Sequence, residues 1–139
     1  ESILVLRNAG PRAAGMPEAG ALPIPKKLGA QGVTDMVRIS DARMSGTAFG
    51  TVVLHVSPEA AAGGPLAAVR DGDIISLDAH KGILDLMVAD EEIALRLGSH
   101  TPVTSLPDSA WSKIQQALIM QAHEGCDLDT TRLLGVKND

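Results

Sequence analysis

The sequence predicts a β-rich α+β domain: a small closed or half-closed β-barrel with short peripheral helices and a C-terminal helix packed outside. Three observations predict this class. Short apolar runs are separated by glycine- and proline-rich loops, one stretch alternates like a β-hairpin, and one late segment has apolar residues at helical spacing. Expected strands outweigh expected helices and are joined by short loops, which favours a barrel over a doubly wound sheet.

The first three expected strands are short aliphatic runs at residues 3–6, 36–39 and 51–56. Residues 73–88 contain apolar residues that alternate with polar ones on both sides of His80-Lys81-Gly82. This pattern predicts a β-hairpin with a glycine-containing loop.

Helix signals occur at four places, and we expect helices over residues 25–30, 58–62, 91–97 and 109–123. Ser57 is expected to cap the second of these, with Pro58 in its first turn. We expect residues 1–98 to form the barrel domain. Residues 99–139 would form a linker, a helix and a tail, either in the same domain or packed on a partner.

Composition excludes several classes of function. The 139 residues suit one domain, and a net charge of −5 with only two aromatic residues argues against nucleic-acid binding. No 18-residue apolar run is present, so no membrane span is expected. Cys126 is the single cysteine, which excludes an internal disulfide and favours a reducing, cytoplasmic location. An apolar run directly after Glu1 suggests a piece of a longer protein.

Local motif rules leave the function open. The glycines around SGTAFG (residues 45–50) lack the spacing and the lysine of a phosphate-binding loop, and Ser45 lacks the flanking glycines of a nucleophile elbow. No histidine pair has metal-ligand spacing, and one cysteine cannot hold an iron–sulfur cluster. Ser45 is therefore either part of a structural turn or a hydroxyl presented to a ligand.

Three stretches together carry a longer signature. The first runs from LRNAGPR (6–12) into GMPE (15–18), the second is SDARMSG (40–46), and the third is HVSPEA (55–60) followed by GGPL (63–66) and VRDGD (69–73). In this order they resemble the C-terminal domain of the IlvD/Edd dehydratase family, over residues 1–98 and again at 121–129. Ala42, where the branched-chain amino-acid enzymes usually carry glycine, makes the second stretch similar to the aldonic-acid dehydratases, such as those for arabinonate or xylonate.

The resemblance implies a hydro-lyase that dehydrates a 2,3-dihydroxy sugar acid to a 2-keto-3-deoxy acid. It implies that Ser45 is the base at C2, that Glu18 is a Mg²⁺ ligand, and that Gly46 and Thr47 bind substrate. Most Mg²⁺ ligands and an iron–sulfur cluster of the 2Fe–2S type would come from an N-terminal domain. The fragment alone is then expected to be inactive, and the full-length enzyme to be a dimer or tetramer.

Two alternatives remain at this point. One is a dihydroxy-acid dehydratase of branched-chain amino-acid synthesis, and the other is a stand-alone, non-enzymatic swivelling or binding module. We interpret His55 as a histidine at the edge of the core rather than a catalytic one. Asp41 and Arg43 are expected to pair with each other or to contact the partner domain.

Overall fold

A computed structural model describes residues 2–20 and 22–134, apart from the side chains of residues 132 and 133. Its strands are β1 (Leu4–Leu6), β2 (Arg38–Ser40), β3 (Val52–Val53), β4 (Ile75–Asp78) and β5 (Ile83–Leu86). Its α-helices are α1 (Pro11–Ala14), α2 (Lys26–Gly29), α3 (Asp90–Gly98), α4 (Ala110–Leu118) and α5 (Thr130–Leu134). Three short 3₁₀ helices are η1 (Ala60–Ala62), η2 (Pro65–Ala68) and η3 (Ala122–Glu124).

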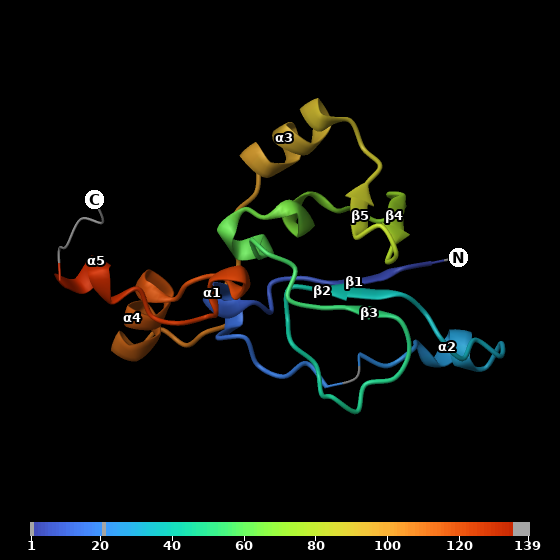
Figure 1. The fold of residues 1–139 in the computed structure, drawn as a ribbon, viewed down its shortest axis with the longest axis horizontal. Coiled ribbons are helices and arrows are strands. Elements are labelled where there is room, and N and C mark those ends of the chain that lie inside the picture. Colours follow the sequence, from blue (N-terminus) through green and yellow to red (C-terminus); the bar gives the residue numbers. More distant parts are fainter. Residues whose placement is uncertain (1, 21, 135–139) are drawn as a thin grey trace.

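The first sheet is parallel, with strand order β1-β2-β3 (Figure 1). Leu4 pairs with Arg38, and Arg38 pairs in turn with Val52. Parallel neighbours need long connections. The connection from β1 to β2 carries α1 and α2, and the connection from β2 to β3 is residues 41–51, the serine loop. The central strand is buried along its length, so both connections end beside the core.

The core lies where β2 meets the two 3₁₀ helices that follow β3. Ile39 is 1% exposed and clusters with Ala60, Leu66 and Ala67. Small alanines let η1 and η2 approach the sheet closely. Trp111 and Phe49 are both exposed, so the core is built from aliphatic side chains, as the shortage of aromatic residues predicts.

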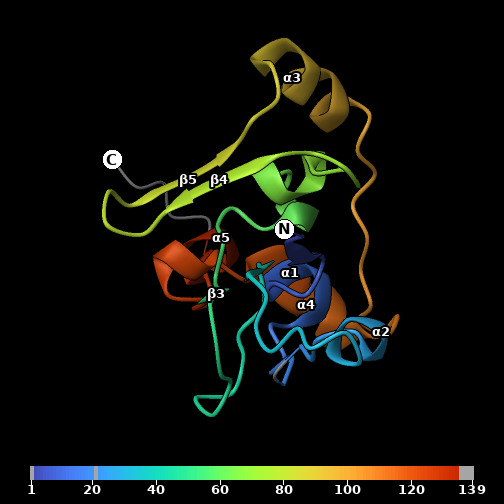
Figure 2. The same cartoon turned by 90° about the vertical axis from the view of Figure 1, so that its right-hand side faces the viewer.

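The second sheet is the antiparallel hairpin β4–β5, in which Ile75 pairs with Leu86. Arg96 on α3 ties this hairpin to the core: it forms an ion pair with Asp73 at 2.6 Å and donates to the carbonyl oxygen of Ala68 at 3.0 Å. In Figure 1 the hairpin and α3 lie on the β1 side of the sheet, while α4 and α5 lie beyond the end near α1. In Figure 2 the hairpin extends to the left of the view, above β3.

Most predicted elements are confirmed, with shorter bounds. The strands near residues 3–6 and 36–39, the hairpin, α2 and α3 are present, and the strand expected over 51–56 is reduced to Val52–Val53. The C-terminal helix is shorter than predicted: α4 ends at Leu118, and Gly125 instead ends η3 in a left-handed conformation. The predicted barrel stays a prediction, because the strands of the described residues form two separate sheets.

The prediction of a helix capped by Ser57 is wrong. The Ser57–Pro58 peptide bond is cis, and the 3₁₀ helix η1 begins only at Ala60, with Glu59 as its N-cap residue. The hydroxyl of Ser57 instead contacts Nδ1 of His123 at 2.6 Å.

The segment after residue 98 contacts the first part of the chain. Thr104 Oγ1 and the Ser105 N–H both donate to the carbonyl oxygen of Ala13, at 2.9 and 2.8 Å. The division into 1–98 and 99–139 stays a prediction, and the end of the predicted tail, 135–139, lies outside the described residues. None of the described helices has the length and apolar character needed to cross a membrane.

Candidate functional site

Ser45 lies in the turn that follows β2 and is partly exposed. Its Oγ lies 2.8 Å from Thr47 Oγ1 and 3.3 Å from the Thr47 main-chain nitrogen, and its carbonyl oxygen accepts from the Ala48 N–H at 2.9 Å. Within the described part of the chain, no ionisable side chain is hydrogen-bonded to this hydroxyl. Ser45 and Thr47 therefore form one exposed pair of hydroxyls.

Glu18 lies beside the serine turn although 27 residues separate it from Ser45 along the chain. An isolated parallel bridge pairs Glu18 with Arg43, and the Ala19 N–H donates to the Arg43 carbonyl oxygen at 2.8 Å. Arg43 Nε also donates to the carbonyl oxygen of Met16 at 3.1 Å. These bonds join the loop that carries Glu18 to the backbone two residues before Ser45.

A buried aspartate, Asp41, holds the start of the loop that carries Glu18. Its side chain accepts three main-chain hydrogen bonds, from Asn8 at 3.1 Å, Ala9 at 3.0 Å and Ala60 at 3.0 Å. Asp41 is 0% exposed and directly follows β2. It therefore binds main-chain N–H groups, rather than Arg43 as one of the two sequence interpretations expected.

A second buried carboxylate, that of Glu59, holds the next part of the loop. It accepts from the N–H groups of Arg12 at 2.7 Å and Ala13 at 3.0 Å, in the first turn of α1, and from Gln121 Nε2 at 2.9 Å. Negative charge at a helix N-terminus is favourable because these N–H groups lack partners within the helix. Gly10 is required beside it, since a Cβ there would lie 2.6 Å from Glu59 Oε2.

The far end of the serine loop is fixed by Asp35. Its side chain accepts from Arg38 Nη2 at 3.2 Å and from the Thr51 N–H at 3.2 Å, while Arg38 also donates to the carbonyl oxygen of Phe49. Gly50 has φ of 98°, and a Cβ there would lie 2.0 Å from Asp35 Oδ1. The loop is therefore anchored at both ends, and Phe49 between them is 82% exposed.

A cavity of about 430 Å³ is lined in part by Arg43. Among its lining residues, Met16 (φ 52°), His55 (φ 56°) and Cys126 (φ 54°) have left-handed backbone conformations, which are uncommon for residues other than glycine. Burial raises the pKa of the Cys126 thiol. His55 is exposed here, so its interpretation as a histidine at the edge of the core is wrong.

The chemistry of the side chains decides which cofactors this chain could help to hold. The carboxylate of Glu18 is exposed and accepts no hydrogen bond from any residue that the structure describes, so a hard cation could bind it. Over residues 2–20 and 22–134, no three His, Cys, Asp or Glu side chains gather as a metal site. Glu18 therefore fits one ligand of a shared Mg²⁺ site, and a chain with one cysteine does not fit an iron–sulfur cluster of its own.

Two features of the site were not foreseen from the sequence. Asp41 and Glu59 were not predicted to hold the loop, and the bridge between Glu18 and Arg43 was not predicted at all. The sequence held a weak signal for both carboxylates, because Asp41 and Glu59 each stand shortly after an apolar segment. The structure brings together the two loops that carry the predicted site residues, which are Glu18 in one loop and Ser45, Gly46 and Thr47 in the other. The chemical roles of these residues stay predictions.

The amino-acid sequence of this chain matches a family of known proteins. Residues 1–126 match the family described as "Dihydroxy-acid/6-phosphogluconate dehydratase C-terminal", and the chain belongs to this family. This confirms the resemblance found in the three sequence stretches.

Among curated relatives, the chain is 54% identical to a 6-deoxy-6-sulfo-D-gluconate dehydratase from Pseudomonas putida, over 93% of the chain and 22% of the relative. It is 54% identical to an L-arabonate dehydratase from Azospirillum brasilense, over 92% of the chain and 23% of the relative. Identity to the mitochondrial dihydroxy-acid dehydratase of Saccharomyces cerevisiae is 39%, over 93% of the chain and 22% of that relative. The chain thus spans about a fifth of the length of these relatives.

Proposed function

We propose that this chain is the C-terminal part of a hydro-lyase that dehydrates a 2,3-dihydroxy aldonic acid to a 2-keto-3-deoxy acid. Ser45 would take the C2 proton, Glu18 would be a Mg²⁺ ligand, and Gly46 and Thr47 would contact the substrate. An N-terminal domain would complete the site and would hold the iron–sulfur cluster. The enzyme would act in the cytoplasm as a dimer or tetramer.

The observation that carries this proposal is the link between the Glu18 loop and the Ser45 turn. The bridge from Glu18 to Arg43 brings a free carboxylate and a free-standing hydroxyl pair onto neighbouring segments. Dehydration of a 2,3-dihydroxy acid needs a residue that binds a cation near the carboxylate end of the substrate. It also needs a group that accepts the proton from C2. The two loops supply one group of each kind.

Ser45 needs electrostatic help to act as a base. A free hydroxyl is a poor proton acceptor near neutral pH, and no His or Lys is hydrogen-bonded to Ser45 among the described residues. A bound Mg²⁺ would supply positive charge that favours the ionised forms of nearby oxygen groups. Thr47, 2.8 Å away, can donate a hydrogen bond to a Ser45 oxygen that carries negative charge.

Gly46 would give the substrate access to the turn. A Cβ added at Gly46 would meet no atom of this chain within 4 Å. The glycine is therefore not required by packing within the chain, and its small size suits close approach of a ligand from outside.

Relatives support the sugar-acid branch over the branched-chain amino-acid branch. Identity is 54% to the sulfogluconate and arabonate dehydratases and 39% to the yeast dihydroxy-acid dehydratase, over similar lengths. We therefore propose a sugar acid as substrate. A stand-alone binding module stays as the alternative that the following experiment distinguishes.

The test uses the full-length polypeptide loaded with its cofactors. Release of a 2-keto acid is measured with a panel of aldonic acids and with a branched 2,3-dihydroxy acid. Ser45→Ala should lower kcat by at least about 100-fold, the usual scale for loss of a general base, while the visible absorbance of the cluster stays unchanged. Ser99→Ala, a change at another exposed serine, is the control and should keep full activity.

Glu18→Gln should weaken Mg²⁺ binding measured by calorimetry, because an amide is a poorer ligand for a hard cation than a carboxylate. Full turnover by Ser45→Ala would reject the role of the base, and unchanged Mg²⁺ affinity would reject the role of Glu18. Absence of turnover with every acid would favour the binding module.

A further inference from the structure

One edge of strand β1 pairs with no other strand of the described residues. On its other edge it pairs with β2, and the Leu4 N–H donates to the Val37 carbonyl oxygen at 2.9 Å. In a parallel ladder, alternate residues turn their main-chain groups toward the same neighbour. Leu4 and Leu6 therefore face β2, and the N–H and C=O groups of Ile3 and Val5 face the opposite side.

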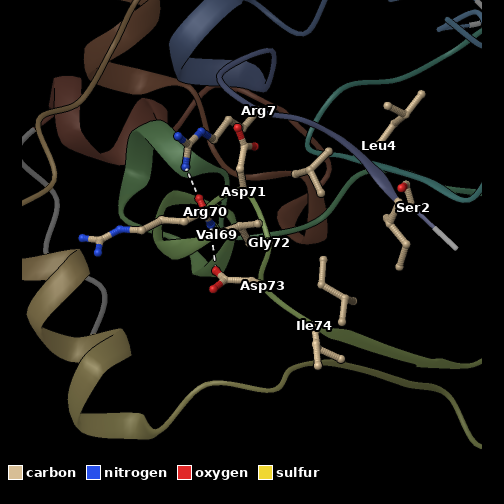
Figure 3. A pocket seen from close by; sticks show the side chains of 12 residues that line it. Ser2, Leu4, Arg7, Val69, Arg70, Asp71, Gly72, Asp73 and Ile74 are labelled. Carbon is tan, nitrogen blue, oxygen red and sulfur yellow. Dashed lines mark hydrogen bonds between the residues drawn. The ribbon is translucent and has the colours of Figure 1, made fainter. Parts of the chain in front are cut away.

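A groove of about 820 Å³ runs along this edge (Figure 3). Ile3, Leu4 and Val5 line it from the strand, and Val69, Ile74 and Ile75 line it from the segment that leads into β4. Ile74 is 71% exposed and so presents a large aliphatic side chain at the groove. The groove thus joins an open strand edge to exposed aliphatic side chains.

Three charged residues that line the groove have partners within the domain. A fourth, Asp71, also lines it, and its side chain has no hydrogen-bond or ion-pair partner among the described residues. Arg7 Nη1 donates to the Val69 carbonyl oxygen at 2.8 Å, Asp73 is paired with Arg96, and Arg70 with Glu92. These groups are poorly placed to recognise a small charged ligand. What the groove offers is a row of main-chain donors and acceptors beside apolar side chains, which is what an added β-strand recognises.

We propose that a β-strand from the N-terminal portion of the same polypeptide occupies this groove and pairs with β1. The chain matches a C-terminal family and spans about a fifth of its relatives, so in a protein of their length most of the polypeptide precedes it. Ser2 lines the same groove, so residues that precede β1 in such a protein are connected at this place (Figure 3). A long open strand edge is also a site of unwanted pairing, which proteins usually cover.

The added strand would lie between β1 and the hairpin, against Ile74. It would extend the parallel sheet by one strand on the hairpin side (Figures 1 and 2). This arrangement goes beyond the proposed activity and does not depend on it, because it concerns neither Ser45 nor Glu18.

The first test is a proline at Val5 in the full-length polypeptide. Val5→Pro removes the N–H that faces the groove and leaves the hydrogen bonds between β1 and β2 in place. Val5→Ala is the matched control, since it loses the same side chain and keeps the N–H. We expect Val5→Pro to lower Tm by several degrees more than Val5→Ala, and equal Tm values would contradict the proposal.

The second test does not depend on how well the proline variant folds. The photoreactive residue benzoylphenylalanine replaces Ile74 in the full-length polypeptide, and the same replacement at Trp111, also exposed, is the control. Cross-linked peptides from an equal mixture of ¹⁴N- and ¹⁵N-labelled protein are identified by mass spectrometry. A cross-link from position 74 to a residue upstream of Glu1 in the same chain supports the proposal.

Three results would overturn it. A cross-link between differently labelled chains would assign the groove to a second copy. Cross-links from position 74 only to residues of this domain would indicate that no upstream strand occupies the groove. The absence of any cross-link would indicate the same. The control at position 111 should give no cross-link to the same upstream peptide.

Discussion

Replacing Glu59 by glutamine tests whether a buried carboxylate holds the loop of the candidate site. Glu59 is 1% exposed and accepts hydrogen bonds from the main-chain N–H groups of Arg12 and Ala13 and from the side-chain amide of Gln121. Glutamine has nearly the same shape but one acceptor oxygen. Its NH₂ group would face at least one of the three donors, so that donor would be left buried without an acceptor.

The expected loss follows from these contacts. A hydrogen bond to a charged group contributes about 1.5–3 kcal/mol, and a buried donor left without a partner costs about 1–3 kcal/mol. The neutral amide recovers part of this, because a buried carboxylate is costly to remove from water. We expect Glu59→Gln to lower the free energy of unfolding by about 2–4 kcal/mol. For a chain of this size the loss corresponds to a fall in Tm of about 6–12 °C.

Urea unfolding followed by far-ultraviolet circular dichroism measures this loss. The fluorescence of Trp111 is a poorer probe, because this side chain is already 69% exposed in the fold. Glu91→Gln, at an exposed position in the first turn of α3, is the control and should change stability by less than about 0.5 kcal/mol. A Glu59→Gln protein as stable as the control would refute the anchoring role of the carboxylate.

Two further predictions concern the serine loop and the hairpin. Gly50→Ala should destabilise the chain by at least about 1–2 kcal/mol in urea unfolding, because its φ is 98° and its Cβ would meet Asp35; Gly46→Ala, which meets nothing, should be nearly neutral and is the control. The hydrogen bond from Arg96 holds the pKa of Asp73 below its ordinary value near 3.9. The ion pair therefore stabilises the fold fully above the ordinary pKa, and this stabilisation is lost as the pH falls through the lower pKa of the folded state. The stability difference between the native chain and Asp73→Asn should therefore be smaller at pH 2.5 than at pH 7, and an equal difference would refute this interpretation.

Local sequence patterns predicted the elements whose signals are local. The hairpin follows from alternation on both sides of a glycine turn, and α3 follows from an acidic start and a glycine end. The cap at Ser57 failed because its hydroxyl binds His123, 66 residues away, and Glu59 takes the capping position. A propensity rule cannot include a partner so distant in the chain.

The sequence proposed residues for the candidate site, whose roles stay predictions, but it did not predict the contacts that hold their loops in place. Motif resemblance identified Glu18 and Ser45, whereas the bridge that brings their loops together depends on Arg43 pairing across the fold. Asp41 was expected to pair with Arg43 or to contact the partner domain, whereas it accepts three main-chain hydrogen bonds within this chain. Such contacts join segments more than 15 residues apart, so they follow from the tertiary structure rather than from spacing.

The carboxylates of Asp41 and Glu59 bind main-chain N–H groups of the loop that carries Glu18, and this has a consequence for protein engineering. Arg12 supplies an N–H to Glu59, and Asn8 supplies one to Asp41, whatever side chain each residue carries. The side chain of Arg12 could thus be exchanged for any other except that of proline, while the loop keeps its path. Asn8 is less tolerant, because its φ of 64° is a left-handed conformation that favours glycine, asparagine or aspartate. A library that varies Arg12 and keeps Asn8, Gly10 and both acids should yield folded proteins with altered surfaces beside the site.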